Sequence, residues 1–160
     1  MNNLDKKLKE LEHLKHCNYG RLLKILRGQF DIWVTEQLTV RQRFEFKLAH
    51  MPFIMNISVE GTNNNELARR ARVTKQAMSK VSKELQDLGY IQVKEDPKDK
   101  RITIYTLTDR GKRFVIEART CVVELMDEHR SVVGKAKYDA MLQVMAELVE
   151  YQDKKLYGDA

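Results

Sequence analysis

The chain has 160 residues, 42% of them hydrophobic, with only two prolines and seven glycines, so it can build one ordinary core, or a small domain plus extra helices, and lacks a disordered composition. Its formal net charge of +6 fits an anionic polymer as a partner, although proteins without such a partner reach similar values. Two cysteines are too few for a disulfide framework, and no signal-peptide core or long uncharged apolar run occurs. We therefore expect a cytoplasmic protein without membrane contacts.

The first part of the chain, residues 1–37, has the periodicity of a helix. Leucine and aromatic side chains recur at spacings of three and four, which predicts an amphipathic helix that bends or breaks near Gly20. The stretch "FEFKL" that follows alternates apolar and charged residues. Residues 38–48 are therefore expected to form a partly extended connection.

Three short helices are predicted next, over residues 50–59, 63–71 and 74–88. Asn63 and Thr74 are residue types that cap helix N-termini, and the glutamate three positions after Asn63 has the spacing of a capping box. The second and third helices are joined by only about two residues, which is too short for anything but a tight turn. This pair therefore predicts a helix-turn-helix.

Residues 90–107 carry the signals of a β-hairpin. The segments "YIQVKE" and "RITIYTL" alternate and are rich in β-branched residues, and "DPKDK" between them suits an exposed turn. A helix-turn-helix that leads directly into a hairpin is a winged helix. We therefore assign residues 48–107 to one winged-helix lobe, with the hairpin as its wing.

Residues 108–160 predict two further helices, with apolar residues at spacings of three or four. Together with residues 1–37 they carry more apolar surface than the winged-helix lobe can cover. We therefore expect both terminal regions to pack against a second copy of the chain and form a homodimer. The predicted fold class is mainly α with a small β-hairpin, a winged helix-turn-helix lobe with N- and C-terminal dimerisation helices.

Positive charge is concentrated in the middle of the chain. Residues 69–101 contain ten basic and five acidic residues, whereas residues 117–160 contain six basic and nine acidic ones. From Arg69 through Lys83 there are six basic residues and no acidic one. A solvated helix face is the ordinary explanation of such a run, but the helix-turn-helix context favours a contact with nucleic acid.

The run "ELARRARVTKQAMSKVSKELQDLGYIQVKEDPKDKRITIYTLTDRGKRF" resembles the DNA-binding core of the MarR family of bacterial transcription regulators. The resemblance rests on "ELA" followed by "VTKQAMSKVSKEL", on "LGYI" before the hairpin, on "DPKDKR" at the wing and on "LTDRG" after it. It covers roughly residues 61–114, and the helices on either side fit the family's dimerisation region by pattern only. It implies a homodimer that binds double-stranded DNA through a winged-helix lobe on each subunit.

The resemblance implies that the helix over residues 74–88 enters the major groove, with its N-terminal residues facing base edges. Gln76 can pair bidentately with adenine, and lysines here can reach guanine acceptors or phosphate. For each of these residues the alternative is plain solvent exposure. The candidates for the major groove are Thr74, Lys75, Gln76, Ser79 and Lys80.

The remaining basic residues of the helix-turn-helix are interpreted as phosphate contacts, which position a protein on DNA without reading its sequence. Met78 and Val81, on the same helix, are interpreted as core. The candidate phosphate contacts are Arg69, Arg70, Arg72 and Lys83.

The wing supplies the second predicted contact. In the family's pattern, an aspartate followed two residues later by an arginine places the guanidinium at the hairpin tip, in the minor groove, and Asp99 and Arg101 match this pattern. The carboxylate would orient the guanidinium through a charge-assisted hydrogen bond, and Lys98 and Lys100 would lie near the DNA backbone. The alternative is a soluble turn with a surface ion pair.

Many members of the family bind small aromatic or phenolic molecules in the cleft between the dimerisation helices and the DNA-binding lobe. No motif marks such an effector pocket in this sequence. The candidates to line it are Trp33, His50, Met51 and Met55, and core packing is the alternative for the apolar ones.

The segment "HLKHC" places His13, His16 and Cys17 at the spacing of one helix face. Imidazole and thiolate bind zinc, but a structural site needs a fourth ligand, and the segment also fits the polar side of a helix. We therefore assign no metal. Some members of the family sense oxidants through an N-terminal cysteine, yet the tyrosines that should accompany it are not found at the expected places.

The sequence thus predicts a bacterial, sequence-specific DNA-binding transcription regulator that acts as a homodimer and responds to a small-molecule ligand. No glycine-rich phosphate loop and no Ser-His-Asp order occurs, so we expect neither enzymatic activity nor a cofactor. Two alternatives stay open. The lobe could serve protein or RNA contacts, or the "HLKHC" residues could make a thiol- or metal-responsive regulator.

Overall fold

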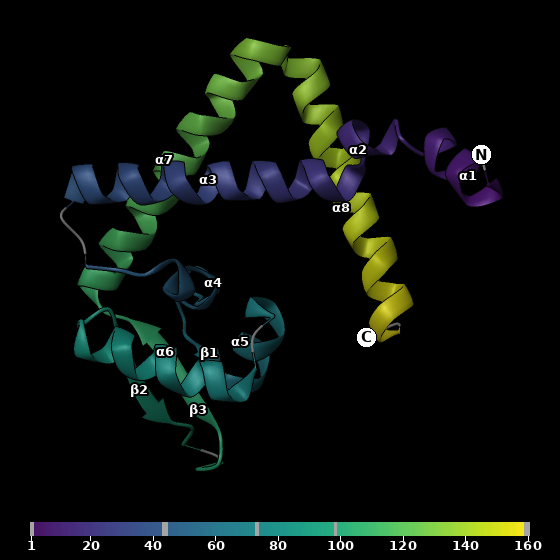
Figure 1. Ribbon diagram of the computed structural model, residues 1–160. Coiled ribbons are helices and arrows are strands. Elements are labelled where there is room, and N and C mark those ends of the chain that lie inside the picture. The colour runs from purple at the N-terminus through teal and green to yellow at the C-terminus, as the bar shows by residue number, and fades with distance from the viewer. Residues whose placement is uncertain (1, 43–44, 73, 98, 159–160) are drawn as a thin grey trace. The chain divides into compact units, whose positions relative to one another are not determined.

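The computed structural model describes residues 2–42, 45–72, 74–97 and 99–158, although the side chains of Cys17, Gln42 and Lys75 are outside this description (Figure 1). Its internal contacts divide the chain into two compact units, Met1–Val115 and Ile116–Ala160, each of which is described by itself. Among the described residues, no helix is both long enough and apolar enough to span a bilayer.

The N-terminal region forms three helices: α1 (Asn3–Glu10), α2 (Leu14–Cys17) and α3 (Tyr19–Gln42). The predicted break near Gly20 is present, but it lies at Asn18, whose backbone is extended and whose side chain accepts a hydrogen bond from the Arg21 N–H at 2.9 Å. Asparagine favours this arrangement because its short side chain can cap the new helix.

Helix α3 continues past residue 37, into the segment that was expected to be partly extended. Val34 and Leu38, one helical turn apart, are 1% and 0% exposed, so burial of an apolar stripe favours helix beyond the predicted boundary. Only residues 45–47 of the described part of that segment lie outside regular structure.

A short 3-10 helix η1 (Leu48–His50) and helix α4 (Met51–Ile54) follow. The prediction of one helix over residues 50–59 is wrong in length, because α4 ends at Ile54. The Asn56 side chain donates to the Pro52 carbonyl at 2.8 Å, and its backbone N–H donates to Phe53 at 3.2 Å, so the chain closes into a turn. Asparagine competes with helix geometry in this way.

The helix-turn-helix is present as α5 (Asn64–Ala71) and α6 (Lys75–Asp87). Asn63 and Thr74 are the N-caps, as predicted, and their side chains accept backbone N–H groups of Glu66 at 2.9 Å and Ala77 at 3.2 Å. These two caps fix where each helix starts.

The wing hairpin belongs to a sheet of three strands, β1 (Thr62–Asn63), β2 (Ile91–Glu95) and β3 (Thr103–Leu107), in the antiparallel order β1-β3-β2. The predicted hairpin is present, with Val93 opposite Tyr105. The short strand β1 was not predicted, because two residues are too few to show a period.

The core of the lobe lies between α5, α6 and the sheet. The Phe53 and Tyr105 rings meet edge to face with centroids 5.1 Å apart, and Leu67 and Leu85 are 0% and 1% exposed. Helix α6 packs against β2, α4 and η1, which leaves its opposite face to solvent.

Helix α7 (Asp109–Val133) begins directly after the wing. Thr108 donates through its hydroxyl to the Gly89 carbonyl at 2.7 Å and accepts the Gly111 N–H at 3.1 Å. Gly111 itself packs against the Tyr90 carbonyl so closely that a Cβ would overlap it. The "LTDRG" sequence therefore seats the start of α7 on the residues that follow α6.

In the second unit, α7 and α8 (Lys135–Tyr157) form a helical hairpin that turns at Gly134, whose φ is +90°. Arg130 near the end of α7 donates to Asp127 at 2.8 Å and to Asp139 on α8 at 2.9 Å, and its guanidinium lies 5.4 Å from the Tyr138 ring centroid. One arginine thus joins both helices near the corner.

Candidate nucleic-acid interface

Helix α6 has two sharply different faces. Met78, Ser82 and Leu85 are buried at 5%, 6% and 1% exposure, at spacings that keep them on one side of the helix. The exposed side carries polar and basic residues that the sequence singled out, Gln76, Ser79, Lys80 and Lys83. Met78 is core, as predicted, and Val81 is half-buried.

The turn before α6 is held by Arg72. Its backbone is left-handed, with φ 52° and ψ 43°, and its N–H donates to the Ala68 carbonyl, which terminates α5. Asparagine and glycine adopt this conformation more readily than arginine does. Val73 lies outside the described residues, so the structure gives only the first half of the turn.

Arg69 and Arg70 on α5 both pair with Glu66. Arg69 donates to the two carboxylate oxygens at 3.0 and 2.8 Å, and Arg70 donates to one of them at 2.6 Å. These hydrogen bonds, first from Arg69 and then from Arg70, lower the pKa of Glu66 to about 2. The carboxylate therefore cancels one of the two positive charges.

This pairing was missed in the sequence, although it has a local signal. Glu66 precedes the two arginines by three and four residues, which is the spacing of side-chain neighbours on one helix face. Arg70 also donates to the Ser58 hydroxyl at 3.0 Å and so ties α5 to the segment after α4.

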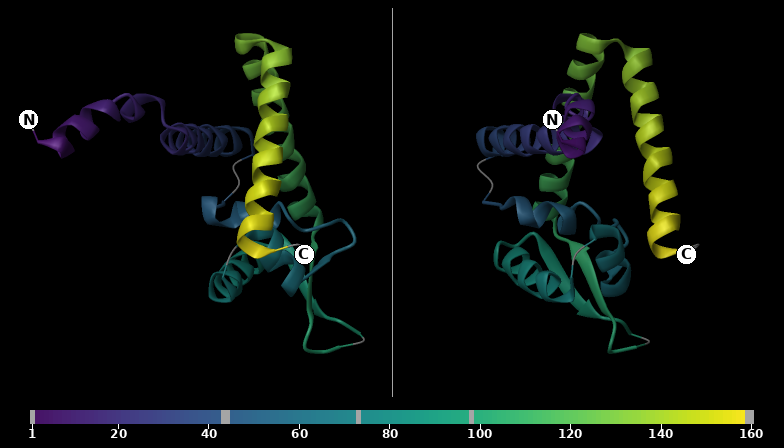
Figure 2. Two further views of the ribbon diagram at one scale, coloured as in Figure 1. Left: turned by 90° about the vertical axis from the view of Figure 1, so that its right-hand side faces the viewer. Right: turned by 45° about the vertical axis from the view of Figure 1, so that its right-hand side comes forward.

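The loop between β2 and β3 extends away from the helices of its lobe (Figure 2). Arg101 donates from Nε and Nη2 to the two oxygens of Asp99, both at 3.0 Å, and its backbone N–H donates to the same carboxylate at 3.0 Å. The Arg101 side chain nevertheless remains 90% exposed. The hydrogen bonds from Arg101 lower the pKa of Asp99 below its ordinary value.

The rest of the loop is held by backbone hydrogen bonds. The Asp96 N–H donates to the Ile102 carbonyl and the Ile102 N–H to the Asp99 carbonyl, each at 2.9 Å. Lys100 is exposed, and the predicted contact Lys98 lies outside the described residues. In the described part of this loop, the Arg101 guanidinium is thus exposed and oriented by Asp99.

A cluster that the sequence did not reveal lies at the other end of α6. Glu84 accepts hydrogen bonds from Lys47 Nζ at 2.9 Å and from His50 Nε2 at 2.8 Å. These two contacts, His50 first, lower the pKa of Glu84 to about 2. The partners are separated by 37 and 34 residues along the chain, so no spacing rule could have paired them.

His50 also lines a cavity of about 460 Å³ beside this cluster. Of the four residues predicted to line an effector pocket, His50 borders this cavity, whereas the half-buried Trp33, Met51 and Met55 do not. Their role in an effector pocket stays a prediction. The lining residues are Glu45, Phe46, Lys47, His50, Glu84, Asp87 and Leu88.

The N-terminal histidines do not form a metal cluster in the described part of the chain. His13 precedes α2 and uses Nδ1 to bond the Glu10 carbonyl at 2.9 Å, and no group of three or more potential ligands occurs among the described residues. The Cys17 side chain is outside them.

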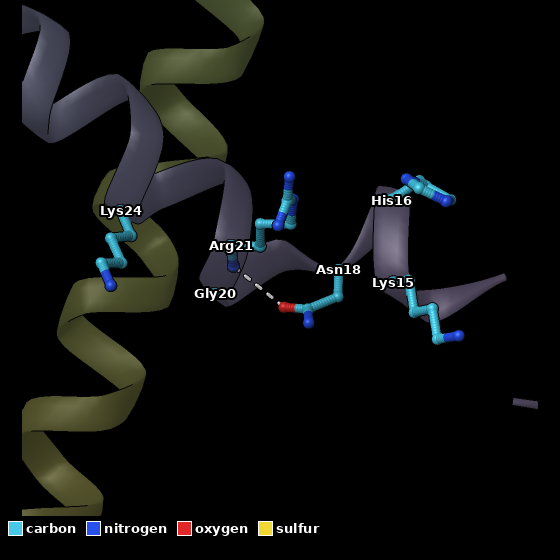
Figure 3. Close-up of a pocket in the computed structure, with 6 residues that line it drawn as sticks. All are labelled: Lys15, His16, Asn18, Gly20, Arg21 and Lys24. Carbon is cyan, nitrogen blue, oxygen red and sulfur yellow. Dashed lines mark hydrogen bonds between the residues drawn. The ribbon is translucent and has the colours of Figure 1, made fainter. Parts of the chain in front are cut away.

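A wide hollow beside His16 is lined by basic side chains of α2 and α3, but Figure 3 shows that Lys15, Arg21 and Lys24 point in different directions. The side chains therefore do not converge on a common centre.

Comparisons with known proteins relate the helix-turn-helix and the wing to one family. A model of the MarR family matches residues 46–102. Transcriptional regulator AdcR of Streptococcus pneumoniae serotype 2 (strain D39 / NCTC 7466) is 41% identical over 64 residues, which is 40% of this chain and 44% of that protein. The match thus spans less than half the length of this curated relative.

Two solved structures are similar over most of the chain. A MarR transcriptional regulator from Methanosarcina mazei Go1 superposes with a TM-score of 0.75 at 19% identity, covering 86% of this chain and 97% of that one. A mutant MarR from E. coli, solved with operator DNA, has a TM-score of 0.66 at 20% identity, covering 85% and 96%. At these identities the likeness confirms the predicted fold class.

Proposed function

We propose that the chain is a regulator of the MarR family, whose model matches residues 46–102, and that it regulates transcription by binding specific sequences of duplex DNA as a homodimer. The observation that carries the proposal is the exposed polar face of α6, on a helix whose opposite face is buried and whose N-terminus is capped by Thr74. A helix held in this way can enter the major groove as a rigid body.

Each part of the exposed face has a proposed role. Gln76 and Ser79, near the start of α6, are assigned to base edges, where amide and hydroxyl groups can discriminate base pairs. Lys80 can reach a guanine acceptor or a phosphate. Lys83, further along the same face, is assigned to phosphate.

The wing supports the second contact. An arginine inserted in the minor groove gains from the negative potential there, which is strongest where A·T-rich sequence narrows the groove. Arg101 is exposed and aligned by Asp99, so its guanidinium is oriented before binding. We therefore assign Arg101 to the minor groove, with Lys100 near the backbone.

The proposed homodimer rests on apolar side chains that remain exposed in the single chain. On α8, Val144 and Val149 are 53% and 52% exposed, and on α3, Leu22 and Leu26 are 48% and 55% exposed. Large apolar side chains left exposed along long helices favour an interface with another chain. A twofold dimer should recognise an inverted repeat.

We further propose that a small molecule regulates DNA binding. A ligand that occupied the cavity at His50 would contact both the segment after α3 and the C-terminal half of α6. Its volume of about 460 Å³ lies in the range of small-molecule sites. Since the proposed partner is chromosomal DNA, we place the activity in the bacterial cytoplasm.

The test is to select bound duplexes from a random pool with the full chain and to measure the mass of the complex by light scattering. We expect an enriched inverted repeat with half-sites about one helical turn apart, bound by a dimer of twice 18.8 kDa. Single-stranded DNA or RNA of the same sequence should compete poorly. No enrichment, or equal competition by RNA, would contradict the proposal and favour an RNA- or protein-binding module.

A further inference from the structure

Glu84 lies on α6 one residue after the proposed phosphate contact Lys83, yet its side chain points to a different part of the protein. We propose that Glu84 is a positioning residue for DNA recognition, which fixes the rotation of α6 about its own axis by bonding His50 and Lys47. This inference rests on the proposed function, because it says how the recognition face is held in register with the groove.

The first support is the polarity of the hydrogen bonds. The Lys47 backbone N–H donates to His50 Nδ1 at 3.1 Å, and a Nδ1 atom that accepts this hydrogen bond leaves the ring proton on Nε2. The Nε2–H then donates to Glu84 at 2.8 Å. His50 is 1% exposed, so the bridge from the main chain of residue 47 to α6 runs through a buried ring.

The second support is the place of Glu84 on the helix. Successive residues of an α-helix are rotated by about 100°, so Glu84 lies between the exposed side, marked by Gln76 and Lys80, and the buried side, marked by Leu85. The hydrophobic driving force that buries the other side of the helix is not directional. A directional hydrogen bond at the border of the two faces is therefore the contact best placed to resist rotation of α6.

This restraint is important because even a small rotation of α6 displaces the tips of its side chains. Side-chain tips lie about 5–6 Å from the helix axis, so a rotation of about 20° moves them by about 2 Å. Hydrogen bonds to base edges weaken steeply over such a displacement. Losing one base contact corresponds to about a tenfold change in affinity.

The proposal makes a prediction opposite in sign to simple electrostatics. As a charge beside Lys83, Glu84 repels phosphates, and its removal should tighten binding to every sequence. As a positioning residue, its removal should weaken binding to the selected sequence while leaving binding to unrelated DNA unchanged or slightly tighter. The ratio of the two affinities therefore separates the two roles.

We would compare the wild-type protein with Glu84→Ala, Glu84→Met and Glu84→Gln on a selected duplex and on an unrelated one at a single salt concentration. Alanine and methionine remove the acceptor, so we expect about a tenfold loss for the selected duplex only. Glutamine should restore most of it, since its amide oxygen can accept from His50 or Lys47. Methionine keeps the length of the side chain, so the Glu84→Met variant tests the proposal if the alanine variant does not fold.

Asp87→Asn is the matched control. Asp87 borders the same cavity from the same helix and is exposed, so the substitution removes a carboxylate of α6 without touching the bond to His50. We expect its affinity ratio to equal that of the wild type within about twofold. A loss as large as that of Glu84→Met would show that charge on this end of α6, and not the bond, sets the ratio.

The imidazole ¹⁵N and ring proton signals of His50 give a readout that does not depend on DNA. We expect the Nε2–H tautomer in the wild type and in Glu84→Gln, and a changed Nε2–H signal in Glu84→Met. An unchanged affinity ratio for Glu84→Met, in a wild type that does select a duplex, overturns this inference alone. A wild type that selects no duplex overturns the proposed function, and this inference with it.

Discussion

The wing and helix α5 each hold arginine against a carboxylate, but they do so with different results. In the wing, Asp99 aligns a single arginine whose side chain stays 90% exposed. On α5, Glu66 binds both Arg69 and Arg70, whose side chains are 69% and 41% exposed. The first pair orients a cation and leaves it accessible, whereas the second reduces the net charge of the surface that carries it.

An ion pair on a basic surface can therefore either orient a cation for nucleic acid or neutralise it. A guanidinium has five N–H donors, so a carboxylate that occupies two of them can leave the others for phosphate or base. What decides the outcome is how far the guanidinium projects and how many arginines share the carboxylate.

Arg101→Ala should cause the largest loss, about tenfold or more on a selected duplex with A·T-rich flanks and less on one with G·C-rich flanks. Arg101→Lys should lose a good part of this affinity, because an ammonium is more strongly hydrated than a guanidinium and cannot pair with both oxygens of Asp99. Affinities measured on the two duplexes at one salt concentration check both statements. Equal losses on both duplexes would contradict a minor-groove role.

Asp99→Ala should also weaken binding, although it removes a negative charge from the wing. The reason is that Arg101 loses the two hydrogen bonds that align it. If alignment is the only role of Asp99, the double variant should lose little more than Arg101→Ala alone. Tighter binding by Asp99→Ala would mean that the pair withholds the arginine, as Glu66 does on α5.

Lys83→Ala supplies the reference for a cation that belongs neither to the wing ion pair nor to the ion pairs of Glu66 on α5. We expect a severalfold loss that is equal for all sequences, together with a decrease of about one unit in the slope of log affinity against log salt for each phosphate contact removed. Titrations on the selected and unrelated duplexes at several salt concentrations give both quantities. A change in the preferred sequence would make Lys83 a base-reading residue.

Glu66→Gln should have a smaller effect in the opposite direction. Removing the shared charge leaves Arg69 and Arg70 with their full attraction for phosphate, so binding to all duplexes should tighten by about twofold, with a steeper salt dependence. Glu60→Gln, an exposed carboxylate in the turn before α5, is the matched control for net charge. Equal tightening in both variants would mean that the pairing itself is unimportant.

The smallest effect concerns stability in acid. The pKa of Glu66 falls from 4.5 to about 2 in the folded protein, so the unfolded chain binds more protons between these values. The stabilisation is complete above pH 4.5 and is lost as the pH falls towards 2. Melting temperatures across this interval should therefore decrease less in Glu66→Gln than in the wild type, by about 1–2 °C. Identical slopes would contradict the assignment.

How far the sequence could predict each feature depends on how local its cause is. Thr74 and the residues that it caps lie within one turn, so a local pattern predicted the cap. Asp99 and Arg101 are two residues apart, and the resemblance to the MarR family predicted their pairing. The group at Glu66 is equally local, but the spacing from Asn63 predicted a capping-box role for Glu66, and its carboxylate binds Arg69 and Arg70 instead.

Features built by tertiary contacts left no such pattern. Glu84 meets His50 across 34 residues, and a histidine in an apolar segment looks the same whether it packs in a core or bridges two helices. The sequence predicted too late an end for α4, because the Asn56 side chain turns the chain by donating to the Pro52 carbonyl. An asparagine within a helical pattern gives no sign of whether it will form such a bond. The fold class survived these errors, because it depends on periodicity summed over long segments.

The close packing of Gly111 on the Tyr90 carbonyl has a consequence for how this sequence can diverge. Any side chain at position 111 would force α7 away from the residues that end α6 and begin the wing. In a saturation library scored for folded protein, this position should therefore be among the most depleted, although it contacts no DNA in the proposed complex. A glycine retained at this position reflects a steric constraint of the fold. That constraint remains even when the preferred DNA sequence changes.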